Sequence, residues 1–458
     1  MGFPGGIEQR AAGVLLHPTS LPGPGATGRL DGRARAFVDW LAAAGFRVWQ
    51  MLPTGPVDDH ACPYQPPSAF AGDTRLLDPD GPSGGDGLEK FRTRNAAWID
   101  DWTLFAALRQ ALGRPWWQWP ADLRDRDPGA LARAREVYAA AIEAETRDQC
   151  RFEHQWSALR DYAAAQGVLL FGDLPLYCAH DSADAWANRG LFALDEGGGI
   201  TGEAGVPPDA FSDTGQHWGQ PLHDWDAQAA DGWRWWIERL RVMAARFDLL
   251  RIDHFRGFCA AWSIPAGAED ARVGHWVPGP GRAPFDAIRD DLGELPLIAE
   301  DLGTITDDVQ VLRDDLGLPG MRVLQFAFDG GDDNPHRPEH HPEWSVAYTG
   351  THDNDTALGW WRGLDEETRA RVCAELATDD HGMPGPLIDS VLHSRARLAM
   401  LPLQDLLGLG SEARMNVPGR RAGNWCWRFR EGALDTAPAS AWRDRLATAG
   451  RPGAPQDP

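Results

Sequence analysis

Three acidic residues, Asp253, Glu300 and Asp353, each stand at or just beyond the end of a short apolar run. Such runs, bounded by polar residues, are typical of strands buried on both faces in a parallel sheet. Acids at the carboxyl ends of different barrel strands converge on one face of the barrel. Two carboxyl groups roughly 5–5.5 Å apart, one ionised and one protonated, can carry out retaining glycoside chemistry. The pattern therefore predicts a carboxylate active site.

Arg251 lies next but one before Asp253. Side chains alternate along a strand, so the two are expected to point the same way and to meet. A guanidinium beside a carboxylate lowers the pKa of that carboxylate, which suits Asp253 as a nucleophile at neutral pH. Burial and mutual repulsion would raise the pKa of the second carboxyl group. The alternative is a purely structural ion pair at a strand end.

Other chemistry fits the sequence less well. Three strand-end acids could bind a metal, but the residues between them supply no clear set of His and Asp ligands. His336, His340 and His341 lie in a loop among acids and prolines, where a solvated surface is the expected setting. A lone Gly-x-Gly-x-x-Gly pattern at residues 23–28 opens no helix, so a dinucleotide site is not expected. We predict no metal and no organic cofactor.

The elements that must position these acids follow from the same apolar runs. A helix is expected over Ala34–Ala44, with Phe37 and Leu41 on its apolar face and Gly45 as its stop. It lies between two strand-like runs, which is how a parallel α/β fold begins. Eight strand candidates with helical connections predict an α/β fold, a (β/α)8 TIM barrel: 13–20, 46–52, 167–174, 247–257, 296–303, 320–328, 345–355 and 398–403.

The whole chain, 1–458, is interpreted as a single catalytic barrel. Its length exceeds one ordinary domain but suits a barrel with insertions. Inserted subdomains are predicted at about 54–166, 175–235 and 262–290, because these segments are long for plain crossovers. The Pro-rich tail after about residue 450 is expected to be disordered.

Composition limits the partners and the compartment. A formal net charge of −23 argues against nucleic acid and anionic membranes. No apolar run approaches the roughly 18 residues of a membrane span, and the N-terminus lacks the pattern of a signal peptide. Six scattered cysteines without a Cys-x-x-Cys pair suit a reducing compartment. We expect a soluble cytoplasmic enzyme.

Several motifs together make the chain similar to a known family. They include His17-Pro18-Thr19-Ser20, Pro63-Tyr64-Gln65, and residues 177–186, 215–219, 251–257, 299–303, 350–355, 402–405 and 423–428. With them the chain resembles, over about residues 13 to 430, the 4-α-glucanotransferases of glycoside hydrolase family 77, in the α-amylase superfamily. These enzymes are also called amylomaltases or disproportionating enzymes.

The resemblance implies a reaction and a role for each acid. Asp253 would be the nucleophile, Glu300 the general acid/base, and Asp353 the third carboxylate gripping sugar hydroxyls, with Arg251 and His352 as the supporting pair. Segments of 1,4-α-D-glucan would pass from a donor maltodextrin to the 4-hydroxyl of an acceptor by retaining double displacement through a glycosyl-Asp intermediate. The partners implied are maltooligosaccharides and starch- or glycogen-derived glucans, bound by a monomer or homodimer. The family also implies that no C-terminal β-sandwich domain follows the barrel.

The resemblance also suggests further substrate-binding residues. Tyr64 would stack on the sugar at the cleavage point. Exposed aromatic rings suit an enzyme of neutral sugars, because apolar sugar faces stack on them. For Trp40, Trp49 and Trp236, plain core packing is the expected role. The remaining candidates for substrate binding are Asp173 in the third-strand motif, Gln216 and Trp218 in a loop over the site, and Asn424 and Trp425 near the donor subsites.

One segment departs from the family pattern, and a separate loop is expected to favour transfer over hydrolysis. Residues Asp58–Cys62 replace the usual Gly-Tyr-Gly-Asp-Ser, so Asp59 stands where an aromatic that would contact a second glucan is expected. The loop from Glu203 to Gly219, with Phe211 as apolar cover, is expected to hold the acceptor and exclude water. The rivals left open are a hydrolase of the α-amylase type and a catalytically silent glucan-binding protein.

Overall fold

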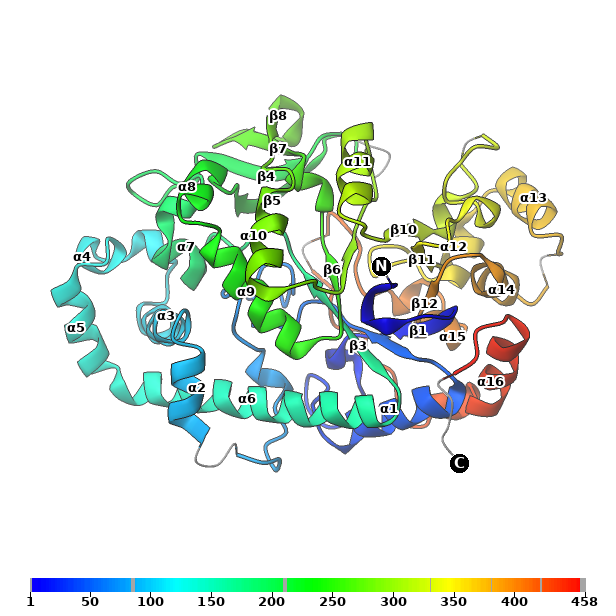
Figure 1. Ribbon diagram of the computed structural model, residues 1–458, viewed down its shortest axis with the longest axis horizontal. Coiled ribbons are helices and arrows are strands. Elements are labelled where there is room, and N and C mark those ends of the chain that lie inside the picture. Colours follow the sequence, from blue (N-terminus) through cyan, green and yellow to red (C-terminus); the bar gives the residue numbers. More distant parts are fainter. Residues whose placement is uncertain are drawn as a thin grey trace.

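The central feature of the molecule is a barrel of eight parallel strands (Figure 1). The computed structural model describes residues 2–83, 87–208, 212–329, 331–379, 381–420 and 422–453. The strand order is β10-β11-β12-β1-β2-β3-β6-β9, and a hydrogen bond from Ala299 N to Pro319 O (2.9 Å) joins the two edges. The strands are β1 (Ala11–Leu15), β2 (Val48–Gln50), β3 (Leu169–Leu174), β6 (Leu249–Ile252), β9 (Leu297–Ala299), β10 (Gly320–Val323), β11 (Ser345–Tyr348) and β12 (Leu398–Pro402).

Each of the eight predicted runs overlaps one of these strands, and seven contain theirs entirely, whereas β1 begins two residues before the run at 13–20; the predicted (β/α)8 barrel is confirmed. The strands are shorter than the apolar runs. The run at 320–328, for example, leaves the sheet at Val323 and continues as a 3₁₀ turn, Leu324–Phe326. One connection also departs from the ideal pattern: the described residues between β10 and β11 contain no α-helix.

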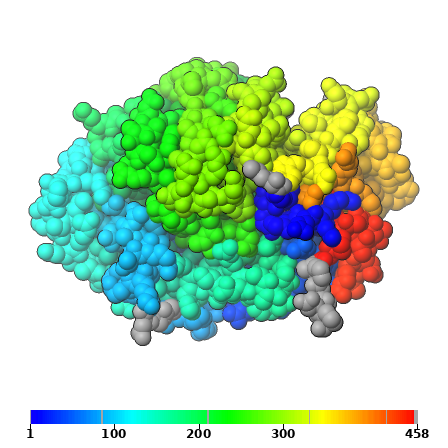
Figure 2. Space-filling model, in the orientation of Figure 1, coloured from blue at the N-terminus to red at the C-terminus, as the bar shows by residue number. Residues whose placement is uncertain are grey.

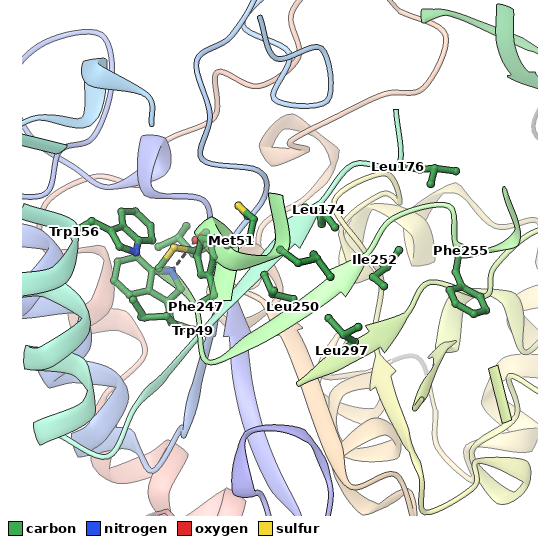
Figure 3. Packing of buried hydrophobic residues seen from close by; sticks show 14 of the residues in the cluster. Trp49, Met51, Trp156, Leu174, Leu176, Phe247, Leu250, Ile252, Phe255 and Leu297 are labelled. Carbon is green, nitrogen blue, oxygen red and sulfur yellow. Dashed lines mark hydrogen bonds between the residues drawn. The ribbon is translucent and has the colours of Figure 1, made fainter. Parts of the chain in front are cut away.

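Alternation along the strands separates two cores. Leu249, Phe171 and Ile298 belong to a cluster inside the barrel, which Phe3 and Ile7 of the N-terminal segment join. Residues of the opposite parity pack outward against the helices. Figure 3 shows this outer packing for Leu250 and Ile252 of β6, with Leu174 and Leu297 from the two neighbouring strands. Arg251 and Asp173 share the parity of the inner cluster, which directs both side chains to the barrel interior.

Helices cover the outside of the barrel. The first begins at an Asp31 N-cap and ends at Gly45, whose φ of 86° allows the left-handed C-terminal turn, as predicted. Trp49 and Trp236 lie in the core and Trp40 packs partly buried against it, also as predicted. The helices are α1 (Gly32–Ala44), α2 (Leu88–Arg94), α3 (Ile99–Leu112), α4 (Ala121–Arg124), α5 (Pro128–Val137), α6 (Ala139–Ala165), α7 (Ala183–Ala187), α8 (Trp225–Ala230), α9 (Arg234–Arg246), α10 (Ala283–Leu292), α11 (Asp307–Asp315), α12 (Ala357–Gly363), α13 (Glu366–Glu375), α14 (Gly385–His393), α15 (Leu403–Leu406) and α16 (Ala439–Thr448).

A second, antiparallel sheet stands beside the barrel, and the sequence reading did not foresee it. Its order is β5-β4-β7-β8, built from β4 (Gly202–Val206), β5 (Gln216–Pro221), β7 (Ala260–Pro265) and β8 (His275–Pro278). β4 and β5 come from the segment between β3 and β6, whereas β7 and β8 come from the segment between β6 and β9. Backbone pairing of Gly205 with Trp262 joins the two segments. The sheet therefore holds two insertions together.

The two ends of the chain pack side by side. Figures 1 and 2 both show α16, in red, against the blue N-terminal part of the chain. Beyond it, the buried Arg451 donates hydrogen bonds to the carbonyl oxygens of Ala11 and Leu392. The tail predicted to be disordered after about residue 450 is therefore still packed at Arg451, because its guanidinium donates to carbonyl oxygens at the start of β1 and the end of α14. The rest of that prediction, residues 454–458, lies outside the described residues.

Candidate active site

Arg251 is the hub of the acidic cluster at the carboxyl ends of the strands. It is buried, and its Nη1 donates to both oxygens of Asp173, at 2.8 and 2.7 Å. Its Nη2 lies 2.9 Å from Asp253 Oδ1 and 4.0 Å from Glu300 Oε2. The predicted meeting of Arg251 with Asp253 is confirmed. One guanidinium thus holds three carboxyl groups, which come from β3 and from the ends of β6 and β9.

The backbone after β6 also contributes to the site. His254 has a φ of 50°, a left-handed conformation that non-glycine residues seldom adopt. In this conformation its N–H donates to Glu300 Oε2 at 2.7 Å, while Leu302 N–H donates to Glu300 Oε1 at 3.0 Å. Glu300 is therefore anchored by two backbone donors. Its side chain is 11% exposed, against 26% for Asp253.

Burial dominates the electrostatics of the two acids. It raises the pKa of the Glu300 carboxyl group, with Arg251 opposing the shift. Burial is also the main cause that raises the pKa of Asp253, to about 8; Arg251 opposes the rise, and the negative charges of Asp173, Glu300 and Asp353 add to it. Arg251 does lower this pKa, as expected, but the expectation that it holds the pKa of Asp253 down is wrong, because the rise caused by burial is larger. Two of the hydrogen bonds from Arg251 go to Asp173, so its charge is shared. Asp253 and Glu300 thus hold a proton between them at neutral pH.

We expect kcat/KM to decline as the pH rises through about 8, because the pair then loses the proton that the general acid must supply. Asp173→Asn removes a negative charge that raises the pKa of Asp253, so the alkaline limb should move to lower pH. The measurement is a pH profile of kcat/KM for both proteins between pH 5 and about 10. An alkaline limb at the same pH in both would contradict this account.

Asp353, the third acid, lies at the mouth of the site after β11. Its side chain is 47% exposed, and its Oδ2 lies 3.3 Å from His352 Nε2. Its Oδ1 accepts a hydrogen bond of 2.6 Å from Asn416 Nδ2, 63 residues further along the chain. Asn416 was missed in the sequence, since it belongs to no motif and lies in a loop far from the acids. No local sequence pattern predicts a hydrogen bond between residues so far apart in the chain.

Three rings form an aromatic wall beside the acids. Tyr64 stacks on His352 with centroids 5.1 Å apart and planes at 12°. Trp425 packs obliquely on both, at 5.8 Å from Tyr64 and 6.0 Å from His352. The Tyr64 hydroxyl donates to Asp173 Oδ2 at 2.7 Å, and burial raises the pKa of Tyr64, which keeps that donor protonated. The structure therefore brings Tyr64, Asp173, His352 and Trp425 together with the acids.

The β4–β5 hairpin reaches the site from the other side. Trp218 lies edge-on to the ring of His254, with centroids 4.8 Å apart. Its carbonyl accepts a hydrogen bond from Gln65, and its indole donates to Gln216 at 3.3 Å. Gln216 is thus tied to the site through Trp218. Phe211, expected to cover the site, lies outside the described residues.

Asn424 has a different setting from the other candidates. Its Oδ1 accepts from Val417 N–H, and its Nδ2 donates to the carbonyl oxygens of Val417 and Arg420. A hydrogen bond from Trp425 N to Met415 O (2.7 Å) closes the same loop. The Asn424 amide therefore cross-links the loop that presents Trp425.

Metal-binding clusters and membrane-spanning helices are both absent from the described residues. Among the described residues, no group of three or more His, Cys, Asp or Glu side chains could hold a metal ion. His340 is exposed, as expected, but the solvated surface expected for His341 is wrong, because it is buried with Nε2 against His336 O. No helix in the part of the chain that the structure describes is long and apolar enough to cross a membrane.

Similar proteins of known family agree with the barrel and with its acidic cluster. A family model described as 4-alpha-glucanotransferase matches residues 16–86 and 81–435. A 4-alpha-glucanotransferase of Thermus thermophilus is 44% identical over 93% of this chain and 96% of its own length. A chloroplastic/amyloplastic enzyme of the same name from Arabidopsis thaliana is 40% identical over 96% of this chain and 84% of its own length. Among solved structures, an amylomaltase from Streptococcus agalactiae in complex with acarbose superposes with a TM-score of 0.93, at 31% identity, covering 97% of this chain and all of that one.

Proposed function

The chain belongs to glycoside hydrolase family 77, the 4-alpha-glucanotransferases, and from this premise we propose how its own residues transfer a glucan segment. Asp253 is the nucleophile, Glu300 the general acid/base and Asp353 the carboxylate that grips sugar hydroxyls. The observation that carries the proposal is the position of Arg251 Nη2, 2.9 Å from Asp253 and 4.0 Å from Glu300. It supports a pair close enough for retaining chemistry, for which carboxyl groups roughly 5–5.5 Å apart are typical.

The same contacts support a division of labour within the pair. The guanidinium lies closer to Asp253, where it stabilises the negative charge of the reactive form; burial raises the pKa of Glu300, which carries the shared proton in that form. In the reactive form, Asp253 attacks C1 of the donor sugar as Glu300 protonates the departing glycosidic oxygen. Glu300 then takes the proton of an acceptor 4-hydroxyl, whose oxygen displaces Asp253 from C1.

The substrates we propose are α-1,4-linked maltooligosaccharides and longer glucans. A wall of Tyr64, His352 and Trp425 offers stacking surface for the apolar faces of neutral sugars. The acids and Asn416 beside it offer partners for hydroxyl groups. We propose that the chain forms one catalytic barrel, with insertions at about 54–166, 175–235 and 262–290, and acts as a monomer or homodimer. We also propose that it acts in the cytoplasm, with which its net charge of −23 and its six free cysteines agree.

Incubation of the purified protein with maltotriose tests the proposed reaction. A transferase produces longer dextrins together with glucose, since a maltosyl unit passes to a second maltotriose. A hydrolase of the α-amylase type would produce maltose and glucose alone, and a silent glucan-binding protein would leave maltotriose unchanged. Either of the last two outcomes would refute the proposal.

Transfer requires the glycosyl-enzyme to react with an acceptor while water, at about 55 M, is kept away. An oriented acceptor can reach an effective molarity of roughly 10⁵ M or more. Trp218 supports this role, because it packs on His254 next to both acids. We expect Trp218→Ala to raise the ratio of hydrolysis to transfer several-fold, more than it lowers donor consumption.

The ratio is measured as glucose and reducing-end release from maltoheptaose, with and without added glucose acceptor. Trp276→Ala is the matched control, because Trp276 lies exposed on β8, the far edge of the same sheet. If Trp218→Ala lowers both reactions together and leaves their ratio unchanged, Trp218 only binds substrate.

A further inference from the structure

Asp353 is held by three groups, two of which come from the distant segment after β12. Asn416 donates to its Oδ1 at 2.6 Å, and Arg414 Nη2 donates to its backbone carbonyl at 2.9 Å. His352 lies 3.3 Å from its Oδ2. Yet the side chain of Asp353 is 47% exposed, so burial alone does not restrict its rotamers. The partner at Oδ1 is therefore the main restraint on how this carboxylate points.

Asn416 is itself rigidly placed. The neighbouring residues open a loop that a hydrogen bond from Trp425 N to Met415 O closes, and the Asn424 amide cross-links it internally. Arg414 also donates from Nε to the carbonyl of Asn416 at 3.2 Å. The donor to Asp353 thus sits at the base of the loop that presents Trp425 to Tyr64 and His352.

We propose that Asn416 is a positioning residue for the transfer reaction: it fixes the carboxylate of Asp353 in the orientation that binds sugar hydroxyls in the transition state. The inference rests on the proposed role of Asp353. It adds a residue from the loop after β12 to a site whose acids come from β6, β9 and β11. A carboxylate that is already oriented loses less freedom when the transition state forms, so the contact acts mainly on kcat.

Asn416→Ala is expected to lower kcat for maltotriose disproportionation about 10- to 100-fold, the effect of losing a hydrogen bond to a charged group. KM should change much less. Val417→Ala is the matched control, since it shortens the next side chain of the same loop and leaves the Asp353 contact in place. A kcat within about twofold of the wild type for Asn416→Ala would overturn the inference, and so would an equal loss in Val417→Ala.

Asn416→Asp provides a second test, the pH dependence of its activity relative to the wild type, which would not change if Asn416 had only a structural role. The new carboxyl group is isosteric, repels Asp353 when ionised, and can donate to it when protonated. The activity of this variant relative to wild type should therefore rise as the pH falls from 8 toward 5. A ratio that stays flat with pH would contradict the proposal. The wild type carries the same other charged or titratable groups around Asp353, so their effects cancel in the ratio: Cys62, Tyr64, Asp253, His352, Asp355 and Arg414.

Asp353→Asn separates a failure of this inference from a failure of the proposed function. If Asp353→Asn keeps normal turnover, the assignment of the third acid is wrong, and Asn416 has nothing to position. If Asp353→Asn is inactive while Asn416→Ala is normal, only the inference about Asn416 fails. If both are impaired, adding Asn416→Ala to Asp353→Asn should cause no further loss, because the two act as one unit.

Discussion

Replacing Asp253 with Asn, or Glu300 with Gln, is expected to lower the turnover of maltotriose at least about a thousandfold. Asp253→Asn removes the proposed nucleophile, whereas Glu300→Gln removes the group proposed to protonate the leaving oxygen and later to deprotonate the acceptor. Both side chains are held by the same scaffold, Arg251 on one and two backbone N–H groups on the other, so the near-isosteric variants should fold. Initial rates on the purified variants, with circular dichroism for folding, check this.

The two variants should differ with an activated donor, such as an aryl maltoside whose leaving group needs no proton. Glu300→Gln should still form the glycosyl-enzyme but resolve it slowly, so a covalent maltosyl adduct on Asp253 should accumulate. Mass spectrometry of the intact protein and of its peptides detects that adduct. Asp253→Asn should show neither adduct nor burst. An adduct on any other residue, or near-normal turnover in either variant, would overturn the assignment.

The exposed Glu294 provides the control. It lies in the connection just before β9, and Glu294→Gln makes the same chemical change as Glu300→Gln away from the acidic cluster. Turnover of Glu294→Gln should stay at the wild-type value. A large loss there would indicate that the assay reports general damage instead of chemistry at Asp253 and Glu300.

Arg251→Met is expected to lower the free energy of unfolding by about 3–5 kcal/mol at neutral pH and to abolish activity, because it leaves buried carboxyl groups without their counter-charge. The Asp173 carboxylate loses the most stabilisation, since it is 1% exposed and accepts two of its hydrogen bonds from Arg251. Asp253 and Glu300 lose the guanidinium between them. Urea unfolding followed by tryptophan fluorescence measures the change.

A double variant tests the reason for that loss. Asp173→Asn in the Arg251→Met background removes the most buried of the uncompensated charges, so it should recover part of the lost stability, although not activity. Asp173→Asn alone should destabilise the protein, because the Tyr64 and Arg251 donors then face an amide. If the two substitutions simply add, the charges are not coupled, and Arg251 stabilises the fold by packing alone.

The antiparallel sheet formed by two of the long insertions could not be predicted from the sequence. Residues 175–235 and 262–290 were recognised as extra, but the pairing of β4 with β7 was not predicted. A strand such as β4 forms only where a partner from a distant segment, here β7, supplies backbone hydrogen bonds, and the local sequence does not reveal that partner. The residues of β4, Gly202–Val206, carry only weak strand propensity. The barrel strands were predictable because burial on both faces leaves continuous apolar runs.

The sequence by itself determined the barrel and placed Asp253, Glu300 and Asp353 beyond the carboxyl ends of its strands, since apolar runs, alternation and motifs are all local in the chain. Alternation alone placed Arg251 beside Asp253. Only the tertiary structure decided how far Asp253 is buried and that Asp173 takes two hydrogen bonds from that guanidinium. Burial, with the negative charge of Asp173 adding to it, raises the pKa of Asp253 to about 8 against the effect of Arg251. Only the tertiary structure brought Asn416 to Asp353. Charge balance and such contacts depend on burial and on distances between residues far apart in sequence, which no local pattern encodes.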